Sequence, residues 1–147
     1  MPTHGEQPQI IALLRLASEA GQAALYARLR ATGHTQLRPS HFRLLRFPGP
    51  DGVRPSALAE RVAMSKQAIN PLINDLEAWG YIKRVPDPRD GRGRVLRLTP
   101  RGRALLKTIR QLHAGIESDW RARLGPERFE TVRNALAELA DADYATA

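Results

Sequence analysis

The stretch LAERVAMSKQAINPLINDLEAWG, residues 58–80, decides the fold of this chain. Its apolar residues recur at helical spacing before and after a short break at Ala63-Met64-Ser65. Pro55 suits the first turn of the helix before the break, and Ser65 can cap the helix after it by accepting a free backbone N–H. Gly80 supplies the C-terminal stop. Two helices joined by so short a turn predict a helix-turn-helix.

Pro71 lies about six residues into the second of these helices. A proline cannot donate a backbone N–H, so it kinks or breaks a helix. The apolar spacing from Ile69 to Leu76 continues across it, which favours one kinked helix over the alternative, a helix that begins at Pro71 with Asn70 as its cap. A kink would change where Lys66 and Gln67 point.

Two strand-like runs follow, Tyr81 to Val85 and Arg94 to Thr99, and they flank the loop PDPRDGRG at residues 86–93. Proline and glycine exclude a helix in the loop, and the flanking alternation of apolar and polar residues predicts a β-hairpin. Thr99-Pro100 is a strong helix start, with threonine as the cap and proline as the first residue. A helix-turn-helix followed at once by a basic hairpin predicts a winged helix.

Amphipathic helices are expected on both sides of this centre. Residues 8–31 have helical spacing, and Pro39 opens a short helix that reaches Phe47. A long helix follows Thr99-Pro100, Gly125-Pro126 ends it, and the last helix has apolar residues at heptad-like spacing. The expected fold class is mostly α with a small β-hairpin wing, a winged helix-turn-helix flanked by N- and C-terminal helices.

The apolar stripes of the terminal helices exceed what a centre of about 65 residues can cover. These stripes run from Leu13 to Leu25, from Leu105 to Trp120 and from Phe129 to Leu139. Pairing with a second copy would bury the surplus, whereas the alternative is a monomeric bundle. The expected domains are an N-terminal dimerisation helix (1–37), a winged helix-turn-helix (38–101) and C-terminal dimerisation helices (102–147).

The positive charge is concentrated in the middle of the chain. The 147 residues include 23 Lys or Arg and 15 Asp or Glu, for a formal net charge of +8. Between Arg38 and Arg101 there are 13 basic and six acidic residues, so this segment carries +7 and the flanks +1. A genomic bias toward arginine would not leave the flanks neutral. A basic centre between neutral flanks is typical of a protein that binds a polyanion.

Several classes of function are excluded by what the sequence lacks. It contains no cysteine, which excludes disulfides, thiol catalysis and cysteine-ligated zinc. No apolar run approaches the roughly 20 residues of a membrane span, and we expect no secretory signal. The four histidines are scattered without metal-ligand spacing: His4, His34, His41 and His113. We therefore expect no catalytic residue, no metal site and no cofactor.

Four stretches occur together in an order and spacing that resemble the MarR (multiple antibiotic resistance regulator) family. They are Leu58-Ala59-Glu60-Arg61, Asn74 to Ile82, Asp87 to Arg92 and Leu98 to Gly102. The resemblance implies a cytoplasmic, homodimeric transcription regulator that is not an enzyme. It also implies dimerisation through the terminal helices and binding to pseudo-palindromic double-stranded DNA. Members of the family are often released by a small aromatic or phenolic ligand, so we expect a repressor of this kind.

The second helix of the helix-turn-helix is expected to enter the major groove as the recognition helix. The groove-facing candidates lie off its apolar stripe: Ser65, Lys66, Gln67, Asn70 and Asn74. Gln and Asn can form paired hydrogen bonds with adenine, and Ser and Lys can contact phosphates or base edges. The alternative is that these residues form only the solvated face of an amphipathic helix.

The wing is expected to reach the minor groove, where negative potential attracts arginine. The candidate residues are Arg89, Arg92 and Arg94. The resemblance favours Arg92 for insertion, and it leaves Gly91 at a position where the family more often has a second arginine. Asp75 and Asp90 are expected to orient wing arginines through charge-assisted hydrogen bonds.

The ligand and two competing functions stay open. A crevice between the winged domain and the dimerisation helices is expected to take a small aromatic ligand. Six residues could line it: Phe42, Phe47, His34, His41, His113 and Trp120. The competing functions are a winged-helix protein-interaction module without DNA binding and a monomeric winged helix that binds RNA.

Overall fold

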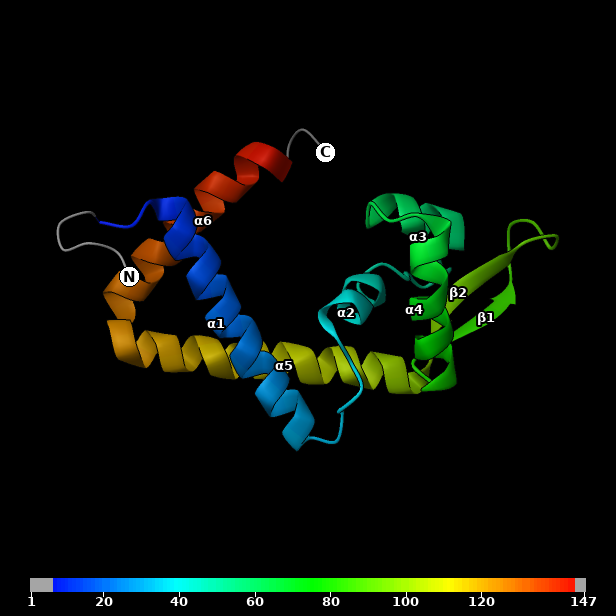
Figure 1. Ribbon diagram of the computed structural model, residues 1–147, viewed down its shortest axis with the longest axis horizontal. Coiled ribbons are helices and arrows are strands. Elements are labelled where there is room, and N and C mark those ends of the chain that lie inside the picture. Colours follow the sequence, from blue (N-terminus) through cyan, green and yellow to red (C-terminus); the bar gives the residue numbers. More distant parts are fainter. Residues whose placement is uncertain (1–6, 145–147) are drawn as a thin grey trace. The chain divides into compact units, whose positions relative to one another are not determined.

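The computed structural model describes residues 7–144 (Figure 1). In chain order its elements are α1 (Ile10–Ala31), α2 (Pro39–Leu45), α3 (Pro55–Arg61), α4 (Lys66–Ala78), β1 (Ile82–Pro86), β2 (Arg94–Leu98), α5 (Pro100–Leu124) and α6 (Pro126–Tyr144). The chain divides into two compact units. The winged unit is Thr32–Arg110, and the helical unit comprises the residues up to Ala31 and from Gln111 onward.

The centre of the winged unit is α4. Its side chains Ile69, Ile73 and Leu76 are completely buried, and the helix packs against α2, α3 and β1. Figure 1 shows α2 and the β1–β2 hairpin on either side of α4, with α3 at one end of it. Burial of one aliphatic face removes apolar area from water and leaves the opposite face of α4 directed outward.

The wing is an antiparallel hairpin of β1 and β2, with one additional partner that the sequence pattern did not predict. Val53 bridges to Leu96 through two backbone hydrogen bonds of 3.0 and 2.8 Å. The neighbouring Gly52 has a φ of +85°, and a Cβ at this position would lie 2.8 Å from Val95 Cγ2. Glycine is required here because the segment before α3 passes directly against β2.

The ends of the helices follow from local chemistry. Ser65 Oγ accepts a hydrogen bond from the Ala68 N–H at 3.1 Å, which caps α4 as predicted. Thr99 Oγ1 accepts from the Gly102 N–H at 3.1 Å and caps α5 in the same way. Gly125, with a φ of +85°, separates α5 from α6.

The structure confirms the predicted fold class, with both strands within one residue of their expected bounds. Two details differ. The helix expected from Pro39 to Phe47 ends at Leu45, because Pro48 disfavours helical backbone in the residue before it. α4 continues through Pro71 as one helix, so the alternative helix start at Pro71 is wrong.

The helical unit consists of α1, α6 and the second part of α5. Its buried apolar side chains are Leu25, Leu29, Ile116 and Phe129. Ion pairs also join its helices, namely Arg28 with Asp119 and Arg133 with Glu117. Within the described residues, no helix has both the length and the apolar character that crossing a bilayer requires.

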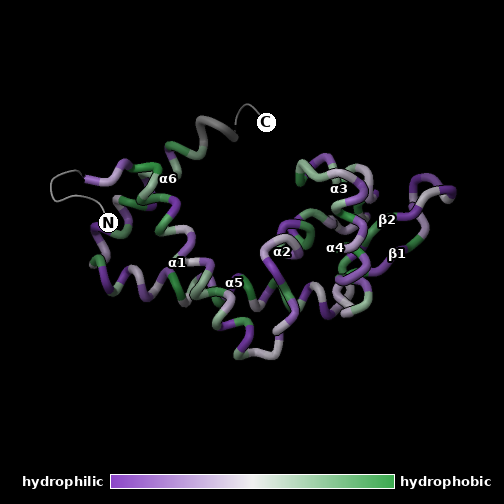
Figure 2. The backbone as a smooth tube through the Cα atoms, viewed as in Figure 1, coloured by the Kyte–Doolittle hydropathy of each residue, from purple (hydrophilic) through white to green (hydrophobic). Residues whose placement is uncertain are grey.

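Large apolar side chains remain exposed on all three helices of this unit. They are Ile10, Ile11, Leu13, Leu14, Leu16, Trp120, Val132, Leu136 and Leu139. Figure 2 shows the corresponding hydrophobic stretches on α1 and α6. Apolar exposure on this scale is typical of a surface that contacts another protein.

Candidate nucleic-acid interface

The N-terminal half of α4 presents a polar face with one basic residue and no acidic residue. Ser65, Lys66, Gln67 and Asn70 are all exposed, whereas Ile69 is completely buried between them. The first turn of α4 contains no acidic residue. The positive end of the helix dipole and the Lys66 ammonium therefore both favour a phosphate here, and the helix itself fits the width of the major groove.

Asn74, the last of the recognition-helix candidates, connects α4 to the wing. Its Oδ1 accepts a hydrogen bond from Arg84 of β1 at 3.1 Å. Arg84 also forms an ion pair with Glu77, one helical turn along α4. These contacts fix the base of the wing against the recognition helix, and they occupy the Asn74 carbonyl that adenine recognition would use.

Asp87 anchors the wing loop. It is only 7% exposed, and its carboxylate accepts from Arg54 Nε at 2.8 Å and from the Arg89 backbone N–H at 2.9 Å. Its own N–H donates to the Gly93 carbonyl at 2.8 Å, which closes the loop. The Arg89 N–H and the Arg54 guanidinium lower the pKa of Asp87 below its ordinary value, because both favour the ionised carboxylate. The Asp87 carboxylate in turn raises the pKa of Arg54.

The pair formed by Arg54 and Asp87 links the wing to the helix-turn-helix, since Arg54 is the residue directly before α3. A Cβ at Gly93 would lie 3.1 Å from the Arg54 guanidinium, so the guanidinium packs directly against the loop. Sequence reasoning missed both residues. The available signals were an Asp directly after a strand and an Arg directly before a helix-starting proline, but the two residues are 33 positions apart.

The two acids expected to orient wing arginines have other partners. Asp75 Oδ2 lies 3.1 Å from Nε2 of His41, because the side of α4 that carries Asp75 packs on α2. This corrects the expectation for Asp75. Asp90 Oδ1 accepts from the Arg92 backbone N–H at 3.1 Å, and Oδ2 lies 3.7 Å from Arg54. Asp90 therefore shapes the loop that carries Arg92 without pairing with the Arg92 guanidinium.

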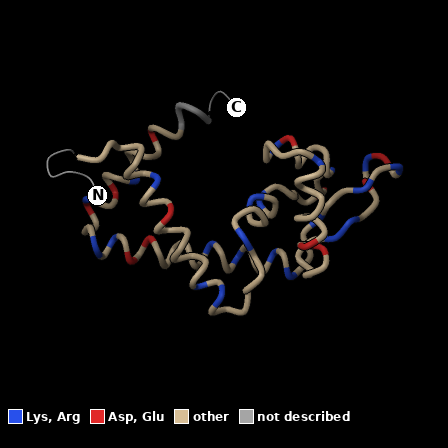
Figure 3. Tube along the Cα trace, viewed as in Figure 1, with Lys and Arg blue, Asp and Glu red and all other residues tan. Residues whose placement is uncertain are grey.

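The wing arginines Arg89, Arg92 and Arg94 are all exposed. Figure 3 shows basic residues along the hairpin and at its tip, next to the acids of the loop. Arg89 lies 3.8 Å from Asp51, which is an exposed pair of little energetic consequence. The winged unit thus combines a polar helix face and exposed arginines on one framework.

His41 lies in the core of the winged unit. It is 2% exposed, and its Nδ1 accepts from the Arg38 N–H at 3.0 Å. Nε2 must then carry the proton and donate to Asp75. The ring also meets Trp79 edge-on, with 4.9 Å between the ring centroids. These contacts satisfy both ring nitrogens within the fold.

The other described histidines, His34 and His113, belong to no cluster of metal-ligating side chains. His34 Nδ1 lies 2.6 Å from the Tyr81 hydroxyl, and burial together with the charge of Arg101 lowers the pKa of His34. His4 lies outside the described residues. In the part of the chain that the structure describes, no three His, Cys, Asp or Glu side chains are grouped so that they could hold a metal ion.

Solved structures with a similar fold include the following three. The reduced form of MarR from E. coli has a TM-score of 0.76 and 19% identity, over 92% of this chain and 98% of that chain. A MepR mutant from S. aureus has a TM-score of 0.74 and 18% identity, over 92% and 98%. CouR from Rhodococcus jostii, bound to p-coumaroyl-CoA, has a TM-score of 0.66 and 22% identity, over 92% and 96%. No match is found among curated proteins.

Residues 35–93, which include the helix-turn-helix and most of the wing, match the family model described as MarR family. This segment of the chain is of the MarR family. In this family the winged helix-turn-helix belongs to transcription regulators, and DNA binding is the function of the family. MarR-family regulators are not enzymes. The family and fold class expected from the sequence are confirmed.

Proposed function

We propose that this MarR-family protein is a cytoplasmic homodimer that binds a pseudo-palindromic operator as a repressor and is released by a small ligand. The exposed face of α4 lies in the major groove through Ser65, Lys66, Gln67 and Asn70. Asn74 holds the wing against this helix through its hydrogen bond with Arg84. The observation that carries the proposal is the polar, acid-free start of α4 on the same compact unit as the exposed wing arginines.

The wing follows the adjacent minor groove through Arg89, Arg92 and Arg94. Asp90 and Asp87 hold the loop by accepting the backbone N–H groups of Arg92 and Arg89. The exposed guanidinium groups can then meet phosphates or the groove floor. About six to ten phosphate contacts in the dimer would make binding strongly dependent on salt, with about 0.9 added to the log–log slope per contact.

The dimer is proposed to form through the terminal segments, residues 1–37 and 102–147, with residues 38–101 presenting DNA contacts. The exposed apolar side chains of α1, α5 and α6 support this assignment, because a second copy would remove them from water. Two-fold symmetry then requires two half-sites about one helical turn apart, which gives roughly 10 base pairs between their centres.

Release by a ligand rests on the family and on CouR, which was solved with p-coumaroyl-CoA bound. A ligand can shift the equilibrium only if it binds one arrangement of the two winged units more tightly than the other. In this reading a small aromatic ligand lowers the operator affinity of the dimer.

Selection of bound sequences from a random duplex pool tests the DNA-binding part of the proposal. We expect an inverted repeat, with the purified dimer shifting it as one complex. Gln67→Ala should relax the preference at one position per half-site by about 1–3 kcal/mol. Lys107→Gln removes a positive charge from an exposed site on α5 and should leave the selected sequence unchanged.

Two results would contradict the proposal. Negligible affinity for any duplex at low salt would instead favour a protein-interaction module. Preference for single-stranded RNA over duplex DNA in competition, together with a monomer in sedimentation, would favour the RNA-binding alternative.

A further inference from the structure

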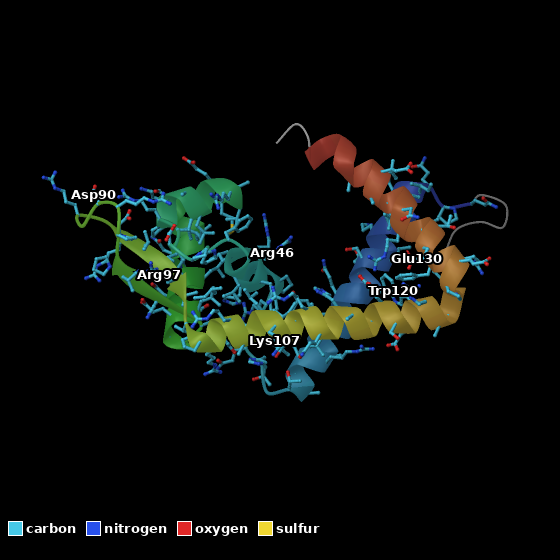
Figure 4. The ribbon with its side chains drawn as sticks, turned by 180° about the vertical axis from the view of Figure 1, so that it is seen from behind. Arg46, Asp90, Arg97, Lys107, Trp120 and Glu130 are labelled. Atoms are coloured by element: carbon cyan, nitrogen blue, oxygen red, sulfur yellow. The ribbon has the colours of Figure 1, made fainter. Side chains whose placement is uncertain are left out.

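A basic hollow lies at the base of the wing, apart from the proposed DNA-contacting residues. It has a volume of about 490 Å³ and is lined by Pro48, Gly49, Pro50, Lys83, Arg97, Leu98 and Arg103. Three of these residues are cationic and none is acidic. Figure 4, drawn from behind, labels Arg97 on the hairpin and Asp90 at the wing tip, with Arg97 at a distance from the tip.

Two of the cations face each other across the hairpin. Lys83 of β1 and Arg97 of β2 are direct partners in the antiparallel register. Like charges in this position destabilise a strand pair unless a negative group lies between them. Neighbouring side chains of a strand point to opposite faces, and Arg84 reaches Glu77 of α4. Lys83 and Arg97 therefore point to the face of the hairpin that is turned away from the recognition helix.

Arg97 has an unmet hydrogen-bonding requirement. Its Nε is buried, and it is the only buried side-chain nitrogen or oxygen of the described residues without a hydrogen-bond partner. A buried N–H of a charged guanidinium normally has an acceptor, because leaving it without one forfeits its hydration. The third cation, Arg103, is held in place by a hydrogen bond from its Nη1 to the Leu98 carbonyl at 3.0 Å.

We propose that this hollow, the basic hollow, binds a small organic anion, a carboxylate or a phosphate monoester with an apolar body. The anionic oxygens accept hydrogen bonds from Arg97, Lys83 and Arg103, and the apolar body packs on Pro48 and Pro50. The volume suits a molecule of this size and is too small for a folded partner. A guanidinium pairs well with the two oxygens of a carboxylate or phosphate.

Anion binding to the basic hollow is independent of the proposed repression. It is measured on the free protein, without DNA. An anion seated there would join three parts of the winged unit, the loop at residues 48–50, the hairpin and the first turn of α5.

The test is calorimetric titration of the full chain with benzoate and with phenyl phosphate at fixed ionic strength. Benzamide serves as the neutral analogue. We expect binding of at least one anion and none of benzamide, and the choice between benzoate and phenyl phosphate identifies the anionic group. Arg97→Gln should weaken anion binding about tenfold or more, since it removes a charge-assisted hydrogen bond. Arg110→Gln, which removes an exposed arginine outside the hollow, is the matched control.

NMR titration of the unmodified protein keeps the test independent of variant folding. The amide resonances of Gly49, Arg97 and Arg103 should shift together on addition of the anion. Equal binding of benzamide, shifts confined to other residues, or equal affinity in Arg97→Gln and Arg110→Gln would each overturn the proposal. If the free protein binds no anion and Lys83→Gln reduces the log–log salt slope of DNA binding, these cations would be assigned to DNA phosphates instead.

Discussion

At the scale of single residues, Asp87 anchors the wing loop. Its carboxylate holds Arg54 and the Arg89 N–H, and its own N–H closes the loop onto Gly93. The hydrogen bonds from the Arg89 N–H and the Arg54 guanidinium favour the ionised carboxylate, which is why the pKa of Asp87 is lowered. The exposed arginines depend on this carboxylate for their position, although it never needs to touch DNA itself.

The conformation of the wing loop should therefore depend on pH, and the lowered pKa of Asp87 sets the direction of this dependence. A carboxyl group with a lowered pKa in the folded state stabilises the fold above the ordinary carboxyl pKa of about 4, and the stabilisation is lost as the pH falls through the lowered value. We expect the Arg89 and Gly93 amide resonances to move only below about pH 4. Asp87→Asn should show the displaced resonances already at pH 7 and no further acid step. Identical titration curves for the two proteins would contradict this role.

Arg92 allows a second prediction at the same scale. Arg92→Ala should weaken binding to every duplex by a similar factor and reduce the log–log salt slope by about 0.9 per lost contact. Titration of labelled duplex at several salt concentrations measures both quantities. Undiminished binding by Arg92→Ala would refute the wing assignment, and Arg110→Ala provides the comparison for net charge.

At the scale of elements, α4 combines a buried face and a recognition face in one helix. Ile69 and Leu76 lie in the core on both sides of Pro71, so packing holds the helix together where proline removes a hydrogen bond. Ser65 contributes at the start of the helix, where its side chain both caps the backbone and lies in the proposed DNA interface.

Two substitutions at Ser65 separate these roles. Ser65→Ala should lower the free energy of unfolding by about 1 kcal/mol, because one backbone N–H loses its cap. Ser65→Asp should keep the cap and the stability but weaken DNA binding through repulsion from phosphate. Urea denaturation and DNA titration of both variants measure these effects. Full DNA affinity in Ser65→Asp would remove Ser65 from the interface.

At the scale of the whole molecule, the chain assigns its two tasks to two units. The winged unit carries the candidate DNA contacts, and the helical unit carries the exposed apolar side chains. Arg84 ties the wing to α4 within the winged unit, so the candidate major- and minor-groove contacts move together. In the proposed dimer, two winged units would meet the two half-sites of an inverted repeat, which raises the affinity by effective concentration.

Loss of the proposed dimer should therefore reduce operator affinity without a change in the winged unit. Leu136→Glu places a charge on an exposed apolar position of α6 and should shift sedimentation toward the monomer. Asn134→Glu adds the same charge at an exposed polar position two residues away and should leave the dimer intact. A Leu136→Glu protein that stays dimeric, or a monomer with undiminished operator affinity, would contradict the assignment.

The order and type of the elements were determined by the sequence alone, because their signals are local. Pro55 and Thr99-Pro100 mark helix starts, Ser65 marks a cap, and the wing loop contains the residues that exclude a helix. The exposed side of α4 followed from periodicity, so the candidates from Ser65 to Asn70 are exposed as expected.

The partners of the charged side chains were decided only by the tertiary structure. Asp75 pairs with His41, Asp87 with Arg54, and Asn74 with Arg84. A carboxylate can pair with any cation that folding brings within a few ångströms, and a chain with 20 arginines offers many. Periodicity fixes which face of an element is buried, but it does not specify which other element that face meets.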